Sequence, residues 1–119
     1  MSDHHNINYV EFLTDDIEST KDFFTRAFAW EFTDYGPDYI SFSERGIAGG
    51  FFRSADTSPA APGNVLVVLF SDDLDATQAR VQVSGGEIIK PIFSFPGGRR
   101  FHFIEPGGNE LAVWGDEED

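Results

Sequence analysis

The sequence contains no cysteine, and its 8 Lys and Arg residues are far outnumbered by 21 Asp and Glu residues. The absence of cysteine excludes a disulfide framework, a thiolate metal site and a cysteine nucleophile. The formal charge of −13 at pH 7 argues against a partner with a phosphate backbone, so we predict no binding to nucleic acid. An acidic surface attracts cationic ligands, but it also suits a cytoplasm rich in salt.

Long apolar runs are also missing. No stretch approaches the ~18 apolar residues that a membrane helix needs, and the start, MSDHHNINYVEF, has no basic segment followed by an apolar run. We therefore predict a cytoplasmic protein with no membrane partner. Aromatic residues, in contrast, make up 15% of the 119 residues, which predicts a packed interior in a single domain.

An internal repeat is the most informative feature of the sequence. The segment FLTDDIEST at 12–20 aligns with LFSDDLDAT at 69–77, at a constant offset of 57 residues. Twice this length nearly fills the chain, which predicts two copies of one supersecondary unit. We expect one domain over 1–119, with a first module at about 6–57, a linker at 58–63, a second module at about 64–115 and an acidic tail at 116–119.

In each copy, a β-rich run ends in a Thr or Ser and two aspartates, and helical periodicity follows. In the first copy, Asp15 and Glu18 are spaced like a capping box. In the second copy, Asp72 or Asp73 can cap the helix, and a glycine pair at 85–86 ends it. The apolar residues that fall on one face of the first helix are Ile17, Phe24, Ala27 and Phe28.

Three short strands separated by Gly or Pro follow each helix. The expected strands cover 31–34, 39–43 and 47–53 in the first copy, and 87–95, 99–104 and 110–114 in the second. Each copy therefore has the order β-α-β-β-β, and the sequence predicts an α+β fold.

This order of elements is accompanied by the phrases AFAWEF after the first helix and FIEPGGNELAVW near the end. Together they resemble the vicinal-oxygen-chelate superfamily of glyoxalases, bleomycin resistance proteins and dioxygenases. The similarity runs from about Ile7 to Trp114 and is closest to the small predicted lactoylglutathione-lyase-related members. It departs at Glu105 and Gly107, turn positions where aspartate and an acidic residue are usual. The resemblance implies two βαβββ modules with curved mixed sheets that enclose a cavity. A second subunit often completes that cavity, so we expect a homodimer.

The metal-using members bind one divalent cation through a side chain on the first and the last strand of each module. The corresponding positions in this sequence are Tyr9, Leu66, Ala112, and Gly49 or Gly50. Leu, Ala and Gly have no donor atom, and a lone neutral Tyr is a poor ligand for Zn²⁺ or Mg²⁺. A site of two His and one carboxylate for iron is lacking as well. We predict no metal and no other cofactor, which disfavours metal-dependent glyoxalase or extradiol dioxygenase activity.

The candidate catalytic residues are Glu11, His102 and Glu110, which the two-residue period of strands places near the implied cavity. Histidine titrates near neutrality, so His102 is suited to be a general base. The plainer interpretation of His102 is a strand histidine hydrogen-bonded to Glu110. Glu11 is either a buried acid or the partner of Arg100, and pairing is the plainer alternative.

Arg100 belongs to the only adjacent basic pair of this acidic chain. An arginine fork suits a carboxylate or phosphate on a small ligand, although a solvated salt bridge is the simpler interpretation. We expect two or three of the surrounding aromatic residues, which include Phe51, to line an apolar pocket, and most of them to be core. The predicted ligand-binding residues are Tyr9, Trp30, Phe42, Phe52, Leu66, Phe93, Phe95, Arg100, Ala112 and Trp114.

Three functions are compatible with the sequence. The first is a metal-independent protein that binds and sequesters a small molecule, in the manner of the bleomycin resistance proteins. The alternative is a glyoxalase-related lyase, isomerase or hydrolase that acts on a small metabolite with acid and base residues in the cavity. The third is a structural or regulatory protein that uses the cavity for dimerisation.

Overall fold

The computed structural model describes residues 4–43, 45–54 and 65–116, which form two modules with the same order of elements. The first module contains β1 (Tyr9–Thr14), α1 (Ile17–Phe28), β2 (Thr33–Asp34), β3 (Tyr39–Phe42) and β4 (Ala48–Arg53). The second contains β5 (Val67–Phe70), α2 (Leu74–Val83), β6 (Glu87–Phe95), β7 (Gly98–Ile104) and β8 (Glu110–Gly115). The predicted α+β fold with two βαβββ modules is confirmed. The expected linker at 58–63 and most of the acidic tail lie outside the described residues.

The two sheets have equivalent strand orders, β1-β4-β3-β2 and β5-β8-β7-β6. In each sheet the first strand of the module pairs in parallel with the last strand, and the remaining pairs are antiparallel. In the first sheet Glu11 lies opposite Gly50, and in the second Val68, which follows Glu11 by the repeat offset, lies opposite Ala112. Both sheets are therefore mixed and four-stranded, and they do not close into a barrel within the chain.

Each helix begins directly after the second aspartate of its module. Asp16 caps α1 by accepting a hydrogen bond of 3.1 Å from the Ser19 amide, and Asp73 caps α2 by accepting one of 3.2 Å from the Ala76 amide. The predicted capping box of Asp15 and Glu18 is wrong by one residue, because the carboxylate that reaches the third helical amide belongs to the residue just before the helix. Asp15 instead donates its amide to the carbonyl of Gly107.

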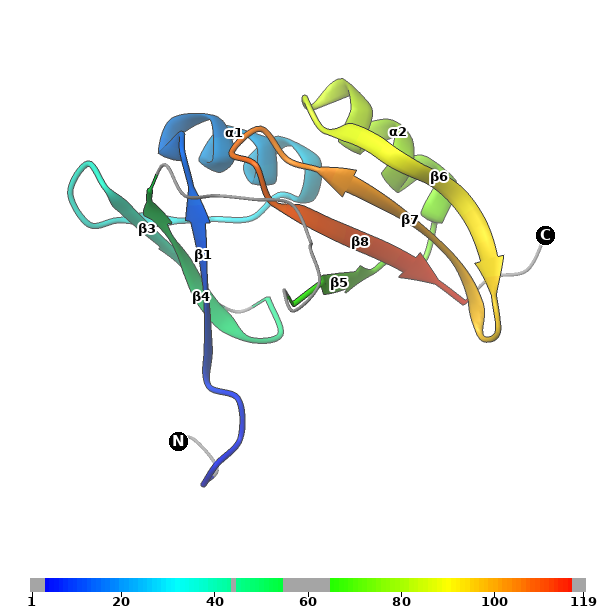
Figure 1. Cartoon of the computed structure of the whole chain (residues 1–119), viewed down its shortest axis with the longest axis horizontal. Helices are drawn as coiled ribbons and strands as arrows, with labels where there is room; N and C mark the ends of the chain where they lie inside the picture. The colour runs from blue at the N-terminus through cyan, green and yellow to red at the C-terminus, as the bar shows by residue number, and fades with distance from the viewer. Residues whose placement is uncertain (1–3, 44, 55–64, 117–119) are drawn as a thin grey trace.

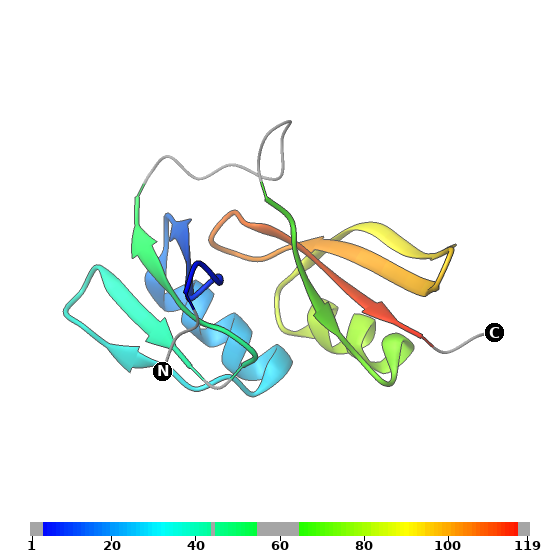
Figure 2. The ribbon, with the colours of Figure 1, turned by 90° about the horizontal axis from the view of Figure 1, so that it is seen from below.

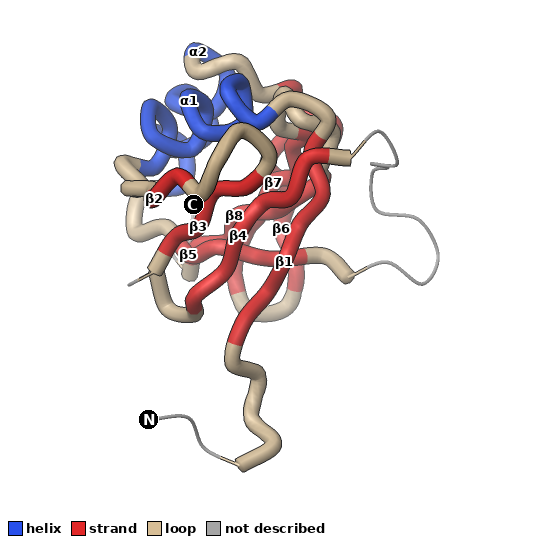
Figure 3. Tube along the Cα trace, turned by 90° about the vertical axis from the view of Figure 1, so that its left-hand side faces the viewer, coloured by secondary structure: helices blue, strands red, loops and turns tan. Residues whose placement is uncertain are grey.

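Both helices lie on the same side of the molecule, and each covers one face of its own sheet (Figures 1 and 3). The core between helices and sheets is aromatic and includes five fully buried phenylalanines, namely Phe23, Phe24, Phe51, Phe101 and Phe103. The strands alternate as expected, since β1 turns Phe12 toward this core and Tyr9 and Glu11 toward the other side. None of the described helices is long and apolar enough to cross a membrane.

The two modules pack on each other through their helices and through the turn between β7 and β8. The ring of Phe103 lies 5.6 Å from the ring of Phe23 and 6.0 Å from that of Phe28, centroid to centroid. In the turn, the Asn109 side-chain amide donates a 2.7 Å hydrogen bond to the carbonyl of Leu13. This packing leaves the second face of both sheets on the same side of the molecule.

Candidate functional site

The sheet faces that point away from the helices form the candidate site, and they lie toward the viewer when the molecule is seen from below (Figure 2). We define the first open face by Tyr9, Glu11, Leu13, Tyr39 and Phe52, and the second open face by Phe70, Phe93, Phe95, Arg100, His102, Glu110 and Trp114. Exposed apolar side chains occur on both, since Phe52 is 45% and Phe70 is 55% exposed. Apolar surfaces with a few polar groups are typical of small-molecule sites.

A chain of hydroxyl hydrogen bonds crosses the first open face. The hydroxyls of Tyr9 and Tyr39 are 2.5 Å apart, and Tyr39 donates a 3.0 Å hydrogen bond to Glu11 Oε1. Burial raises the pKa of Tyr39, and its hydrogen bonds to Tyr9 and Glu11 raise it further. Tyr39 therefore keeps its proton at neutral pH. Both hydroxyls lie above Gly50, where an added Cβ would be 2.6 Å from the Tyr9 oxygen.

The residues at the four metal-binding positions of the related enzymes do not fit a divalent ion. Tyr9 offers a phenol that is already shared with Tyr39, while Gly50, Leu66 and Ala112 offer no donor atom. Among the residues described in the structure, no three His, Asp or Glu side chains converge where they could hold a metal ion.

A histidine–carboxylate pair lies on the second open face. His102 Nδ1 is 3.0 Å from Glu110 Oε2, which is the hydrogen bond that the sequence suggested. The imidazole is only 3% exposed, and the ring of Phe93 stacks on it at 5.9 Å. His102 Nε2 has no hydrogen-bond partner among the described residues. With Nδ1 donating to the carboxylate, Nε2 is left as a buried acceptor, and such a group costs about 1–3 kcal/mol when unpaired.

Arg100 lies against aromatic rings, and no carboxylate of the described residues forms a salt bridge with it. Its guanidinium carbon is 5.5 Å from the centroid of Phe93 and 5.4 Å from that of Phe95. The predicted pairing of Glu11 with Arg100 is wrong within this chain, because the two residues lie on different sheets and Glu11 accepts its hydrogen bond from Tyr39. Trp114 extends this aromatic group, 6.3 Å from Phe95.

Two predicted ligand-binding residues lie in the core. Phe42 and Trp30 are 5% and 8% exposed, and their rings pack 4.6 Å apart on the helix side of the first sheet. The strand period explains the position of Phe42, which shares the core face with Ile40. Trp30 also lines a hollow of about 430 Å³, together with Arg45, Gly46, Val68, Leu69 and Phe70.

The remaining predicted ligand-binding residues divide by depth. Phe52, Phe93, Phe95, Arg100 and Trp114 reach the open faces, whereas Ala112 is fully buried in β8 and Leu66 is half-buried just before β5. Tyr39 was missed by the sequence analysis. The alternation of the strand 39–42, with Ile40 and Phe42 buried, is the signal that could have identified it.

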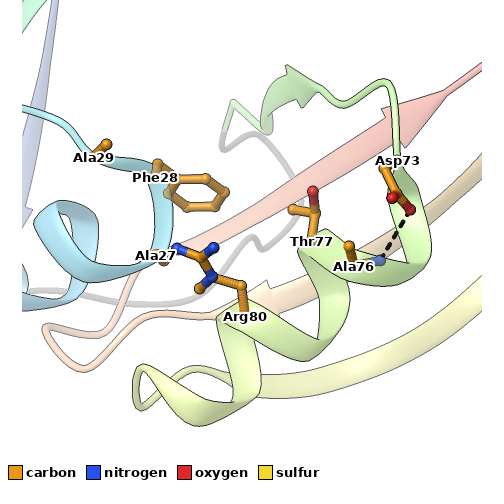
Figure 4. A pocket seen from close by; sticks show the side chains of 7 residues that line it. All are labelled: Ala27, Phe28, Ala29, Asp73, Ala76, Thr77 and Arg80. Atoms are coloured by element: carbon orange, nitrogen blue, oxygen red, sulfur yellow. Dashed lines mark hydrogen bonds between the residues drawn. The ribbon is translucent and has the colours of Figure 1, made fainter.

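Figure 4 shows a second hollow, of about 260 Å³, between the end of α1 and the start of α2. Its polar groups are already engaged: Asp73 caps α2, Thr77 pairs with the Ser71 hydroxyl at 2.7 Å, and Arg80 donates to the carbonyl of Arg26 at 3.4 Å. This hollow is a gap at the module junction, and its polar lining groups already have hydrogen-bond partners in the chain.

The sequence model of the glyoxalase/bleomycin resistance protein/dioxygenase superfamily matches residues 6–113 of the chain. The chain belongs to this superfamily. A similar curated member is the anthracycline biosynthesis protein DnrV of Streptomyces peucetius, with 35% identity in a match that covers 83% of this chain and 42% of that protein. The chain thus spans less than half the length of the curated relatives that it matches.

Solved structures of the superfamily have the same fold. A glyoxalase-related enzyme from Fulvimarina pelagi superposes with a TM-score of 0.79 at 15% identity, covering 93% of this chain and 88% of that one. TnmS3, an antibiotic binding protein from Streptomyces sp. CB03234, superposes with a TM-score of 0.70 at 18% identity, covering 98% of this chain and 100% of that one. At these identities the likeness shows a shared fold, and one fold can support many different functions.

Proposed function

We propose that this chain is a metal-independent member of the superfamily that binds a small aromatic molecule on its open sheet faces. The observation that carries the proposal is the aromatic group of the second open face, where Phe93 and Phe95 flank the Arg100 guanidinium at about 5.5 Å. Rings of this kind bind apolar surface, and a guanidinium fixes the orientation of an acceptor group on the ligand.

A second copy of the chain completes the site in this proposal. Phe52, Val68 and Phe70 are 45%, 42% and 55% exposed on adjoining sheet faces that no described helix covers. Exposed apolar patches of this kind mark interaction surfaces. We therefore propose a homodimer in which the ligand lies between sheet faces, which would supply the enclosure that the open sheets of one chain lack.

Two similar proteins support a role in ligand binding. TnmS3 is an antibiotic binding protein, and DnrV belongs to anthracycline biosynthesis. An antibiotic-like aromatic molecule is therefore the ligand class that we propose, held without chemical change. The donor-poor metal positions at Gly50, Leu66 and Ala112 support the metal independence of this binding.

The direct test is equilibrium binding of 1-naphthylmethanol, a neutral aromatic probe, followed by ligand-observed NMR in the presence of EDTA. We expect saturable binding that Phe93→Ala weakens several-fold and that EDTA leaves unchanged. Val83→Ala is the matched control, because Val83 is 71% exposed on α2, away from the open faces. Absence of binding to the wild type, or equal loss in both variants, would reject the proposal.

A second candidate is acid–base catalysis by His102 and Glu110, acting as a lyase or isomerase. The unpaired Nε2 of His102 favours it, because a histidine oriented at Nδ1 by a carboxylate has the arrangement of a general base. We would incubate the protein with the methylglyoxal–glutathione hemithioacetal and follow product by NMR. Turnover that disappears in His102→Gln while probe binding remains would favour the enzyme over the binding protein.

A further inference from the structure

We propose that the first open face binds the ammonium group of a cationic aromatic ligand, with Glu11 as the counter-charge and Tyr9, Tyr39 and Phe52 around it. The inference rests on the proposed function, because it assigns the charge of the ligand that the open faces hold.

Within the chain of Tyr9, Tyr39 and Glu11, the direction of the hydrogen bonds leaves only acceptors for a ligand. Tyr39 has one hydroxyl proton, and it donates that proton to Glu11 Oε1. The short contact with Tyr9 therefore requires the Tyr9 hydroxyl to donate to the Tyr39 oxygen. The groups left for a ligand are Glu11 Oε2 and the lone pairs of Tyr9, which accept hydrogen bonds and give none. An ammonium group, which only donates, complements them.

The charge of Glu11 is not balanced within the described part of the chain. Its carboxylate accepts from the Tyr39 phenol, and no Lys, Arg or His of the described residues forms a salt bridge with it. The chain as a whole carries −13. This field attracts cations and repels anions, so it favours the same positively charged ligand as the acceptors of Glu11 and Tyr9.

Aromatic side chains lie on the same face as the carboxylate, and one of them, Tyr39, contacts it directly. The ring of Tyr39 lies 6.5 Å from that of Phe52 and 6.5 Å from that of Tyr35. Tyr9 and Phe52 are 42% and 45% exposed, so parts of both rings are accessible. Ring faces stabilise an organic cation by about 0.5–1 kcal/mol each at exposed sites, which corresponds to roughly 2- to 5-fold in affinity.

Gly50 makes this arrangement possible. The two hydroxyls occupy the space above its Cα, and a side chain at this position would displace them. Gly50, which with Gly49 is one of the two positions that the resemblance aligns with a metal ligand of related enzymes, thus admits the phenol pair because it has no side chain. Gly50→Ala becomes a probe of the hydroxyl arrangement that leaves Glu11 itself in place.

The test compares 1-naphthylmethylamine, a cation at pH 7, with neutral 1-naphthylmethanol and anionic 1-naphthylacetate, each titrated by NMR at low salt. For the wild type we expect the amine to bind on the order of tenfold more tightly than the alcohol. In Glu11→Gln the preference falls to within about twofold, because the counter-charge of the ammonium group is removed. Glu31→Gln, which removes the same charge from an exposed residue outside the open faces, keeps the preference. Gly50→Ala reduces it, because the acceptors move apart.

The outcomes separate this inference from the function on which it rests. If the alcohol does not bind the wild type, the proposed function fails. If the alcohol and the amine bind equally well, the proposed function stands and the ammonium site is rejected. If Glu11→Gln dissociates a dimer and leaves the preference for the amine intact, the partner of Glu11 is a basic side chain of a second copy, which also rejects the ammonium site.

Discussion

Thr20 donates a hydrogen bond of 2.8 Å to the carboxylate of Glu105, a residue 85 positions further along the chain and in the other module. The carboxylate is 1% exposed and also accepts from the amide of Gly107 and the side chain of Asn109, each at 2.7 Å. Thr14 adds a hydroxyl 2.7 Å from that of Thr20. Hydroxyl and amide donors thus stabilise a buried carboxylate at the module junction, where unpaired polar groups are costly.

Replacement of this carboxylate is expected to weaken the junction. In Glu105→Gln, an NH₂ group replaces one carboxylate oxygen. This group cannot accept hydrogen bonds from the surrounding donors, so those bonds are lost. We expect a loss of about 2 kcal/mol in the free energy of unfolding at pH 5, measured by urea denaturation. Glu87→Gln, at an exposed position on β6, is the control and should change stability by less than about 0.5 kcal/mol.

The same pair of proteins gives a pH dependence with a definite sign. Burial raises the pKa of Glu105, although its hydrogen bonds from Gly107, Asn109 and Thr20 oppose the shift. The folded state then holds this proton more tightly than the unfolded state, so the contribution of Glu105 to stability is greatest at low pH and falls as pH rises through the raised pKa. The advantage of wild type over Glu105→Gln should therefore shrink between pH 5 and pH 8. An advantage that grows over this range would contradict the sign of the shift.

The two helix caps should differ in strength. Asp16 accepts from both the amide and the hydroxyl of Ser19, at 3.1 and 2.8 Å, whereas the one donor to the Asp73 carboxylate among the described residues is the Ala76 amide. We expect Asp16→Ala to cost about 1–2 kcal/mol and Asp73→Ala about 1 kcal/mol in urea denaturation. The Ser19 amide and then its hydroxyl lower the pKa of Asp16, so its contribution is present at neutral pH and is lost as pH falls through that lowered pKa. Equal costs would mean that the Ser19 hydroxyl adds nothing.

Gly49 and Gly50 are adjacent on β4 but should respond differently to alanine. A Cβ at Gly49 would meet the Phe42 ring and the Val10 carbonyl, both at 2.5 Å, and neither can move without disturbing the core. We expect Gly49→Ala to cost about 3 kcal/mol, as overpacking of a core does. At Gly50 the added atom meets the outer ends of two tyrosine side chains, which can turn away, so the cost should stay under about 1 kcal/mol. Urea midpoints at a constant slope would measure both.

Local sequence signals predicted the fold well because residues that repeat in the sequence form equivalent hydrogen bonds in the two modules. Thr14 and Thr20 of the first module pair at 2.7 Å, and Ser71 and Thr77, each 57 positions later, pair at the same distance. The alternation of apolar and polar residues also placed Arg100 on the open side of its sheet. These features depend on residues close in the sequence, which a period or a motif can reveal.

The parts that the sequence did not predict depend on contacts between distant segments. Glu105 was interpreted as a turn residue, because no local sequence pattern predicts that its carboxylate accepts a hydrogen bond from Thr20 of the other module. The proposed partner of Glu11 was wrong because strand alternation fixes the face of a side chain but not which sheet lies opposite. Phe42 was assigned to a pocket because the residue type alone does not show which face of a strand an aromatic side chain occupies.

The proposed homodimer predicts which exposed apolar residue controls the oligomeric state. Phe70 is 55% exposed at the end of β5, where its ring packs against Trp114 on the second open face, and Val83 is 71% exposed at the end of α2. A charge at Phe70 would have to be buried in a dimer formed through the open faces, whereas a charge at Val83 would stay in solvent. We therefore expect light scattering to give a dimer for wild type and Val83→Glu, and a monomer for Phe70→Glu. Circular dichroism would establish that both variants remain folded. A folded Phe70→Glu dimer, or a monomeric wild type, would mean that the open faces are not the subunit interface and that one chain alone forms the ligand site.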